Sequence, residues 1–345
     1  MLICTLLNQL KTTKQIFLIT MKKESKIKMH DTSNFCIIIF CHKKDFFLAE
    51  ILVSSIRYYY PFVEIYICKD LLSGDFQTTE MEKYWGVKIL DLGITHFGWS
   101  AAKMHFYLSD KLKGKKALLM DADIVFTGKV LDRLIPLAME NDVVVSHEYH
   151  AGNEGEWLKK QYYDIDIVKQ MHPDFQLPGY YFNCGQLIAR SELFTAEEVE
   201  GVFDKNNFPF WLNKTDFPLV DQGVLNYLLP YKEQKKELKI ARDNYYIWID
   251  TDVARQMDFQ GVLGGDQYPY MIHWAGNERI PYIYGMFRSD ILVYFQKLYF
   301  DRIPYGKLKR LYPLIPAGLD FFIRTCYRRT RKRYRQLKSK LSIKT

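Results

Sequence analysis

Short apolar runs alternate with amphipathic segments along the chain from residue 35 onward. Residues 35–41 form a β-branched, apolar run, which is typical of a strand buried on both faces. Residues 46–59 carry apolar side chains at helical spacing, and residues 63–68 alternate in the manner of a second strand. These three segments predict one β-α-β unit with parallel strands.

The alternation continues, with strands predicted at 87–92, 117–120 and 143–146 and a helix at 101–112. Such a chain is expected to form an α/β fold whose sheet is mostly parallel and doubly wound, with helices on both faces. Ligands of these sheets bind at the carboxyl ends of the strands. Residues that follow predicted strands are therefore the first candidates for a functional site.

The pattern is weaker in the second half of the chain. Residues 150–180 lack clear periodicity and are interpreted as a long functional loop or insertion. Order returns later, with further elements predicted at 181–189, 220–229, 238–249 and 270–273.

Three regions are predicted from these patterns and from the distribution of charge. They are a poorly ordered N-terminal extension at 1–33, a main domain at 34–304 and a basic amphipathic helical tail at 305–345. Thirteen Lys and Arg against one acid give the last 39 residues a net charge of +12, and residues 1–34 carry +4. Because the whole chain carries +8, about −8 remains on residues 35–306.

The basic tail is interleaved with Phe, Tyr and Leu, which favours an anionic membrane surface as a partner. A solubilising tail without a partner is the alternative. Nucleic acid is not expected as a partner, because the main domain is acidic and no nucleic-acid-binding fold is recognisable in the pattern.

Composition bears on the location of the protein. Its 345 residues, 48% hydrophobic, are enough to bury a large core. The six cysteines include no CxxC pair, so the sequence suggests neither a zinc module nor a disulfide framework. A reducing compartment fits this pattern best. No apolar run reaches the roughly 18 residues that span a bilayer, and no signal-peptide pattern is found. We therefore expect a cytoplasmic protein, peripheral on the inner face of the membrane, with Met21 or Met29 as alternative starts.

The segment Asp121-Ala122-Asp123 lies between the apolar runs 117–120 and 124–126. Two carboxylates are thus expected where a buried strand leaves the sheet. Carboxylates at this spacing can share one hard divalent cation, which takes phosphate oxygens as further ligands. A solvated strand-end turn is the structural alternative. The same spacing occurs at Asp164 and Asp166 and at Asp250 and Asp252, but neither pair follows a comparable apolar run.

Four further motifs accompany this pair in a fixed order. Lys103-Met-His105 precedes the strand, and Phe182-Asn-Cys-Gly185, Asp221-Gln-Gly-Val-Leu-Asn226 and His273-Trp-Ala-Gly276 follow it. In these motifs the chain resembles the family 8 glycosyltransferases, a glycogenin-like and lipopolysaccharide-glycosyltransferase-like group of retaining enzymes with the GT-A fold. The resemblance covers roughly residues 35–284. It implies transfer of a hexose from UDP-glucose or UDP-galactose, with retention, to a glycan or lipid-linked acceptor such as a lipopolysaccharide or capsule intermediate.

The resemblance also implies a metal site. Asp121, Asp123 and His273 would hold Mn²⁺ or Mg²⁺, Gly276 would let the backbone approach the diphosphate, and Arg279 would clamp a phosphate. The family usually continues the histidine motif with a lysine, a proline and an aromatic residue, whereas this chain has Arg279-Ile280-Pro281-Tyr282, with an arginine and one extra residue. Without the resemblance, His273 would be interpreted as a core histidine.

The donor sugar is expected to contact residues from the other motifs. By the resemblance, Lys103 stabilises the leaving group, Asn183 and Gly185 accommodate the sugar, and Asp221 binds it with Gln222 near the reacting face. The structural alternatives are a solvated helix lysine, a buried strand with a bulge glycine, and an N-cap aspartate.

The first strand matches the family least. Cys41, Phe46 and Ala122 are expected to contact the donor, with Phe46 stacking on its base. Lysines stand at 43 and 44, however, where the family usually has acids. Two other functions remain open: a haloacid-dehalogenase-like phosphohydrolase with Asp121 as nucleophile, and a catalytically degenerate membrane-bound scaffold.

Overall fold

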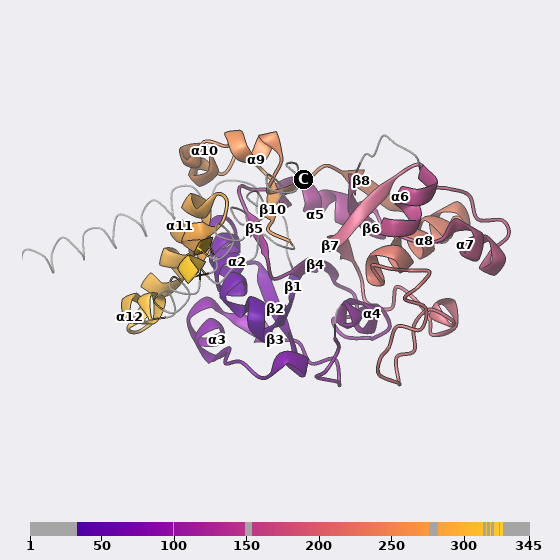
Figure 1. The fold of residues 1–345 in the computed structure, drawn as a ribbon, viewed down its shortest axis with the longest axis horizontal. Helices are drawn as coiled ribbons and strands as arrows, with labels where there is room; N and C mark the ends of the chain where they lie inside the picture. The colour runs from indigo at the N-terminus through magenta and orange to yellow at the C-terminus, as the bar shows by residue number, and fades with distance from the viewer. Residues whose placement is uncertain are drawn as a thin grey trace, which may run out of the picture.

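A seven-stranded sheet forms the centre of the protein (Figure 1). The computed structural model describes residues 33–98, 100–148, 154–275 and 282–312, together with 315, 318, 321–323, 325 and 326. The strand order is β3-β2-β1-β4-β7-β6-β8. Their bounds are β1 (Phe35–His42), β2 (Glu64–Asp70), β3 (Val87–Ile89), β4 (Lys116–Asp121), β6 (Val143–Glu148), β7 (Tyr181–Ala189) and β8 (Ile240–Asp243).

The sheet is parallel except at β7. Strands β1, β2, β3 and β4 pair in parallel, as do β6 and β8, whereas β7 is antiparallel to both β4 and β6. The predicted mostly parallel α/β sheet is therefore confirmed. Because β7 is reversed, its first residues lie beside the carboxyl ends of β4 and β6.

Helices cover both faces of the sheet. Figure 1 shows α2, α3 and α11 on one side and α4, α7 and α8 on the other, and a separate buried apolar cluster fills each side. The helices are α2 (Phe46–Tyr59), α3 (Thr79–Trp85), α4 (Ala101–Tyr107), α5 (Leu131–Glu140), α6 (Glu154–Gln161), α7 (Ile165–Met171), α8 (Asp221–Gln234), α9 (Asp252–Gln256), α10 (Phe259–Gly264), α11 (Ser289–Asp301) and α12 (Gly306–Leu311).

A second, three-stranded sheet lies next to the carboxyl end of β4. It consists of β5 (Ile124–Phe126), β10 (Met271–His273) and β9 (Tyr246–Trp248), in that order. β10 is antiparallel to β5 and parallel to β9. Since β5 follows β4 after a two-residue turn, this small sheet brings the end of β10 to the end of β4.

Three predicted elements differ from the structure. The supposed loop at 150–180 contains α6 and α7, two helices of eight and seven residues, which are too short to give a clear period. The helix predicted at 101–112 ends at Tyr107, whose carbonyl accepts hydrogen bonds from Leu193 and Phe194. The segment 238–249 is divided into β8 and β9 rather than forming one element.

The predicted extension and tail lie largely outside the described residues. The domain boundaries at 34 and 304 stay predictions, although β1 begins at Phe35 and α11 ends at Asp301. In the parts of the chain that the structure describes, no helix has the length and apolar character needed to cross a bilayer.

Candidate active site

Two carboxylates and an imidazole converge at the end of β4. Asp121 is the last residue of β4, Asp123 lies in the following turn, and His273 ends β10. The register of β10 on β5 pairs His273 with Ile124, so the imidazole lies beside Asp123. His273 Nε2 is 3.0 Å from Asp123 Oδ1, and one ligand atom from each of the three residues lies within 4.8 Å of the others.

The space between these three side chains fits a cation. A methyl group at Gly185 would lie 2.8 Å from His273 Cε1 and 3.1 Å from Asp121 Oδ2, so glycine keeps this space open. Asp123 and His273 are buried, whereas the Asp121 side chain is 38% exposed and can be reached from solvent. Oxygen and imidazole donors in this number suit a divalent metal ion with positions left for substrate.

Lys103 brings a buried positive charge to the same point. It lies on α4, which is buried along its whole length, and its ammonium donates hydrogen bonds of 2.6 Å to both Asp121 Oδ1 and the Cys184 carbonyl. Its Nζ is also 3.9 Å from Asp221 Oδ2. Burial lowers the pKa of Lys103, but the two carboxylates outweigh this effect, so its pKa is raised and the ammonium stays charged.

Asp221 begins α8 and is buried next to Lys103. Burial raises the pKa of its carboxyl to about 6, partly opposed by the Lys103 ammonium, while hydrogen bonds from Ser100 and the Gln222 amide favour its charged form. The preceding Val220 has φ of 39°, which is unusual for a β-branched residue. Backbone strain of this kind is concentrated at functional sites, and here it sets the direction in which α8 starts.

The first half of β7 bulges toward this cluster. β6 and β7 pair at Val145 with Leu187 and at His147 with Phe182, so more residues lie between the pairs on β7 than on β6. Within the bulge, Asn183 Oδ1 accepts a hydrogen bond from the Gly185 amide and its Nδ2 donates to Gln222. β7 therefore has both a bulge glycine and a buried amide side chain beside the site.

Asn226 holds the bulge against α8. Its side chain is fully buried and bonds to both the amide and the carbonyl of Phe182, and it also donates to the Gln222 carbonyl one turn earlier in the helix. Both backbone groups of the buried Phe182 are thus satisfied by one side chain. This residue belongs to the predicted motif, but its role could not be read from the sequence.

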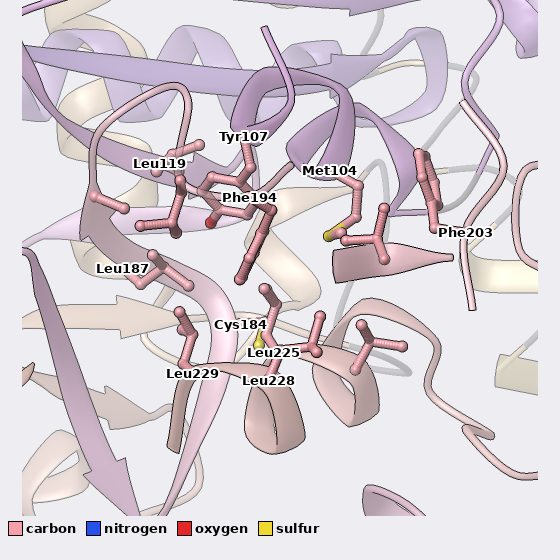
Figure 2. Close-up of a cluster of buried hydrophobic side chains, with 14 of the residues drawn as sticks. Met104, Tyr107, Leu119, Cys184, Leu187, Phe194, Phe203, Leu225, Leu228 and Leu229 are labelled. Carbon is pink, nitrogen blue, oxygen red and sulfur yellow. The ribbon is translucent and has the colours of Figure 1, made fainter. Parts of the chain in front are cut away.

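An apolar core fixes the two helices that carry Lys103 and Asp221. Figure 2 shows Met104 and Tyr107 of α4 facing the leucines of α8, with Phe194 between them. Cys184 and Leu187 of β7 complete the contact in the same view. The charged groups therefore project from a packed framework, and their spacing is set by the core.

The other residues predicted to contact the donor are buried, half-buried or outside the described residues, and their contacts stay predictions. The Cys41 side chain is buried in the core and its thiol donates to the His42 carbonyl. Phe46 is half-buried with its ring 4.8 Å from that of Phe76. Ala122 is buried in the turn between the two aspartates, and Gly276 and Arg279 lie outside the described residues.

The other two aspartate pairs have structural settings. Asp164 caps α7 by accepting a hydrogen bond from the Asp166 amide, and it forms an ion pair with Lys159. Asp252 is 84% exposed and lies near Arg255 in α9. In the sequence, the preceding apolar run distinguished Asp121 and Asp123 from the other two pairs. Among the described residues, the structure brings only this one of the three pairs together with a histidine.

Sequence reasoning missed Glu148, Tyr246 and Trp248. The Trp248 ring stacks on His273, and its indole nitrogen donates to Glu148. The Tyr246 hydroxyl is 3.5 Å from His273 Nδ1. The available signal was weak, since Glu148 lies two residues beyond the predicted strand 143–146 and Trp248 lies one residue before the end of the predicted segment 238–249.

Solved glycosyltransferase structures resemble this chain, although no protein-family model and no curated protein matches its sequence. The bifunctional glycosyltransferase WbbM is similar with a TM-score of 0.54 and 14% identity, over 83% of this chain and 52% of WbbM. The chain thus spans about half the length of that enzyme.

Two weaker similarities are to other glycosyltransferases. The galactosyltransferase LgtC has a TM-score of 0.44 and 16% identity, over 79% of this chain and 99% of LgtC. GlyE of Streptococcus pneumoniae TIGR4 has a TM-score of 0.45 and 14% identity, over 76% of this chain and 60% of GlyE. On the WbbM similarity and on its own sheet topology, the chain has the GT-A glycosyltransferase fold.

Proposed function

We propose that the protein is a metal-dependent glycosyltransferase that moves a hexose from a nucleotide-diphosphate sugar, with UDP-glucose or UDP-galactose as the expected donor. The observation that carries the proposal is the convergence of Asp121, Asp123 and His273 with Lys103 at the end of β4 in a GT-A fold. The expected acceptor is a glycan or a lipid-linked glycan.

Asp121, Asp123 and His273 would hold the cation. Carboxylates suit Mg²⁺ and Mn²⁺ alike, and the imidazole favours Mn²⁺ because it is the softer of the two ions. When bound, the cation would neutralise the charge that develops on the leaving diphosphate. Lys103 would add a fixed positive charge beside Asp121, in a place where burial strengthens its electrostatic effect.

Asp221, Gln222 and Asn183 would surround the sugar. The hydrogen bond between Asn183 and Gln222 joins β7 to the start of α8, where Asp221 is the first residue. We propose that Asp221 accepts hydrogen bonds from sugar hydroxyls and that Gln222 faces the anomeric carbon. Retention would follow from departure and attack on the same face, with the site supplying position and excluding water.

Exposed side chains around α12 support the proposal of a membrane-bound acceptor. Tyr305, Leu308 and Tyr312 are 78%, 69% and 80% exposed around α12, which also carries Lys307 and Arg310. Exposed aromatic and basic side chains on one short segment suit an anionic lipid surface. The full chain is expected to sediment with anionic vesicles at low salt and to be released at high salt. Equal sedimentation with zwitterionic vesicles would argue against this.

Hydrolysis of the donor by the full chain tests the catalytic proposal. With Mn²⁺ and a panel of UDP-sugars, we expect slow release of UDP from one sugar and none with EDTA. Asp121→Asn and Asp123→Asn are each expected to lower the rate by at least about 100-fold, the scale of losing a preorganised charge in a closed site.

The double substitution Asp250→Asn with Asp252→Asn is the matched control, since it makes the same chemical change at the same spacing on two exposed side chains. It should leave the rate unchanged. A chain that is folded but releases no UDP and binds no UDP-sugar would contradict the assignment. Hydrolysis of an aryl phosphate that is lost in Asp121→Asn would instead indicate a phosphohydrolase.

A further inference from the structure

Strand β9 places an aromatic ring against the proposed metal ligand His273. β9 runs parallel to β10, and their register pairs Trp248 with His273 at the ends of both strands. Paired side chains in neighbouring strands lie on the same face about 5 Å apart. The indole and the imidazole accordingly stack, with 5.2 Å between ring centroids and an angle of 11° between the planes.

Such a contact matters because rotamer preferences alone do not fix an imidazole ring. The second side-chain torsion of histidine has broad, roughly two-fold wells, so neighbouring groups set the plane of the ring. Around His273, Asp123 Oδ1 is 3.0 Å from Nε2 on one edge, and the Tyr246 hydroxyl is 3.5 Å from Nδ1 on the other. Trp248 covers the face and leaves the plane little freedom.

The indole is itself anchored. Its Nε1 donates a 2.9 Å hydrogen bond to Glu148 Oε1, and the other carboxylate oxygen accepts a 3.3 Å hydrogen bond from the Tyr162 hydroxyl. Glu148 is the last residue of β6, in the main sheet. The orientation of Trp248 is therefore tied to a different sheet from the one that carries His273.

We infer that Trp248, anchored by Glu148, is a positioning residue that holds the His273 imidazole in the plane needed to bind a divalent cation. The inference rests on the proposed metal site. Groups that orient a metal-binding histidine typically change metal affinity or activity by 10- to 100-fold when they are replaced. Neither Trp248 nor Glu148 need touch the metal ion for this effect.

Binding of Mn²⁺ to the full chain, measured by calorimetry and by the loss of the free-ion EPR signal, tests this inference without any turnover. Trp248→Leu is expected to weaken Mn²⁺ binding by about 10-fold, and Trp248→Phe, which keeps a stacking ring, by less. Glu148→Ala should weaken binding, whereas Glu148→Gln, which can still accept from the indole and donate to Tyr162, should bind as the wild type does.

A double substitution separates positioning from charge. If Glu148 acts through the indole, Glu148→Ala adds little to the loss already caused by Trp248→Leu. If its charge attracts the cation directly, the two losses add and Glu148→Gln also binds weakly, which would overturn the anchoring role.

Trp85→Leu is the matched control, because the Trp85 ring is also buried and stacked on another ring, that of Tyr299, but lies at the end of α3. Both tryptophan variants are expected to lower the melting temperature, but only Trp248→Leu should change Mn²⁺ affinity. Wild-type affinity in Trp248→Leu, with binding lost in His273→Ala, would overturn the inference and leave the metal site intact. Absence of Mn²⁺ and Mg²⁺ binding by the wild type would contradict both.

Discussion

Gly185 shows how one residue can be required by the chemistry of its neighbours. An added Cβ would lie 2.7 Å from Asn183 Oδ1, 2.8 Å from His273 Cε1 and 3.1 Å from Asp121 Oδ2. All three atoms belong to side chains with proposed roles at the site. The space above Gly185 is thus the space in which a cation and a sugar phosphate would lie.

Gly185→Ala is therefore expected to damage the site more than the fold. The methyl group would push the proposed ligands apart, so Mn²⁺ affinity should fall by about 10-fold or more, comparable to the loss of an orienting group. Mn²⁺ titration followed by EPR measures this change. Gly155→Ala, on α6 with open space around its Cβ, is the control and should keep wild-type affinity. Normal Mn²⁺ binding in Gly185→Ala would show that the cation lies elsewhere.

Asp221 gives the protein a pH-dependent stability. Its pKa is raised by burial from 3.8 to about 6. At a pH between these two values, the Asp221 carboxyl is mostly protonated in the folded chain but mostly ionised in the unfolded chain. The contribution of Asp221 to the free energy of unfolding consequently decreases as the pH rises through this window. Ionisation of the buried carboxyl then costs up to about 3 kcal/mol, since one pKa unit corresponds to about 1.4 kcal/mol.

Asp221→Asn is expected to remove this dependence. In EDTA, chemical unfolding should find the variant more stable than the wild type at about pH 7 but similar to it near pH 4, with Lys103 still paired to Asp121. Asp250→Asn, on an exposed turn, is the control and should follow the wild type. Stability curves that remain parallel for the wild type and Asp221→Asn across this range would contradict the raised pKa.

At the residue level, the sequence predicted the aspartate pair and its histidine better than their surroundings. Asp121 and Asp123 follow an apolar run, and His273 ends another, so strand patterns alone place them at strand ends. Their convergence required the resemblance, because no local pattern shows that β10 pairs with β5. Trp248 and Glu148 were missed for the same reason, since their contacts depend on register between strands far apart in the chain.

At the scale of elements, the first turn of α8, which carries Asp221, lies against the backbone of the segment that follows α6. A Cβ on Gly223 would be 2.0 Å from the carbonyl oxygen of Tyr162. Glycine therefore allows the first turn of α8 to touch this backbone. The same turn begins with Asp221, and α4 packs against α8 through the core that Figure 2 shows.

Gly223→Ala should consequently destabilise the fold. Because the opposing atom belongs to the backbone, the helix itself must move, and a loss of about 1–3 kcal/mol or more in unfolding free energy is expected. Urea denaturation measures it. Gly155→Ala, on an exposed part of a neighbouring helix, should be neutral or slightly stabilising. An equally stable Gly223→Ala protein would show that α8 does not need this close approach.

Strong periodicity over long segments predicted elements well, whereas short elements were missed. Residues 46–59 match α2 at both ends, and 181–189 match β7. The helices α6 and α7 have two turns each and polar exposed faces, which leaves too few apolar positions to define a period. The split of 238–249 into two strands depends on pairing with different sheets, which no local pattern encodes.

At the scale of the whole molecule, two sheets meet where the charged groups are. The main sheet supplies Asp121 and Glu148, the small sheet supplies His273 and Trp248, and α8 supplies Asp221. Ligands of open α/β sheets bind at the carboxyl ends of the strands, and the site follows this rule. The reversed strand β7 adds its bulge at the same edge, and α4 adds Lys103.

Binding of UDP to the full chain, measured by calorimetry with Mn²⁺ or with EDTA, tests the central claim most directly. We expect binding with Mn²⁺ that is lost in EDTA and in His273→Ala, while the chain with Asp250→Asn and Asp252→Asn binds UDP as the wild type does. UDP binding of equal strength in EDTA, or in folded His273→Ala, would show that the cluster at the end of β4 does not hold a metal ion for the nucleotide.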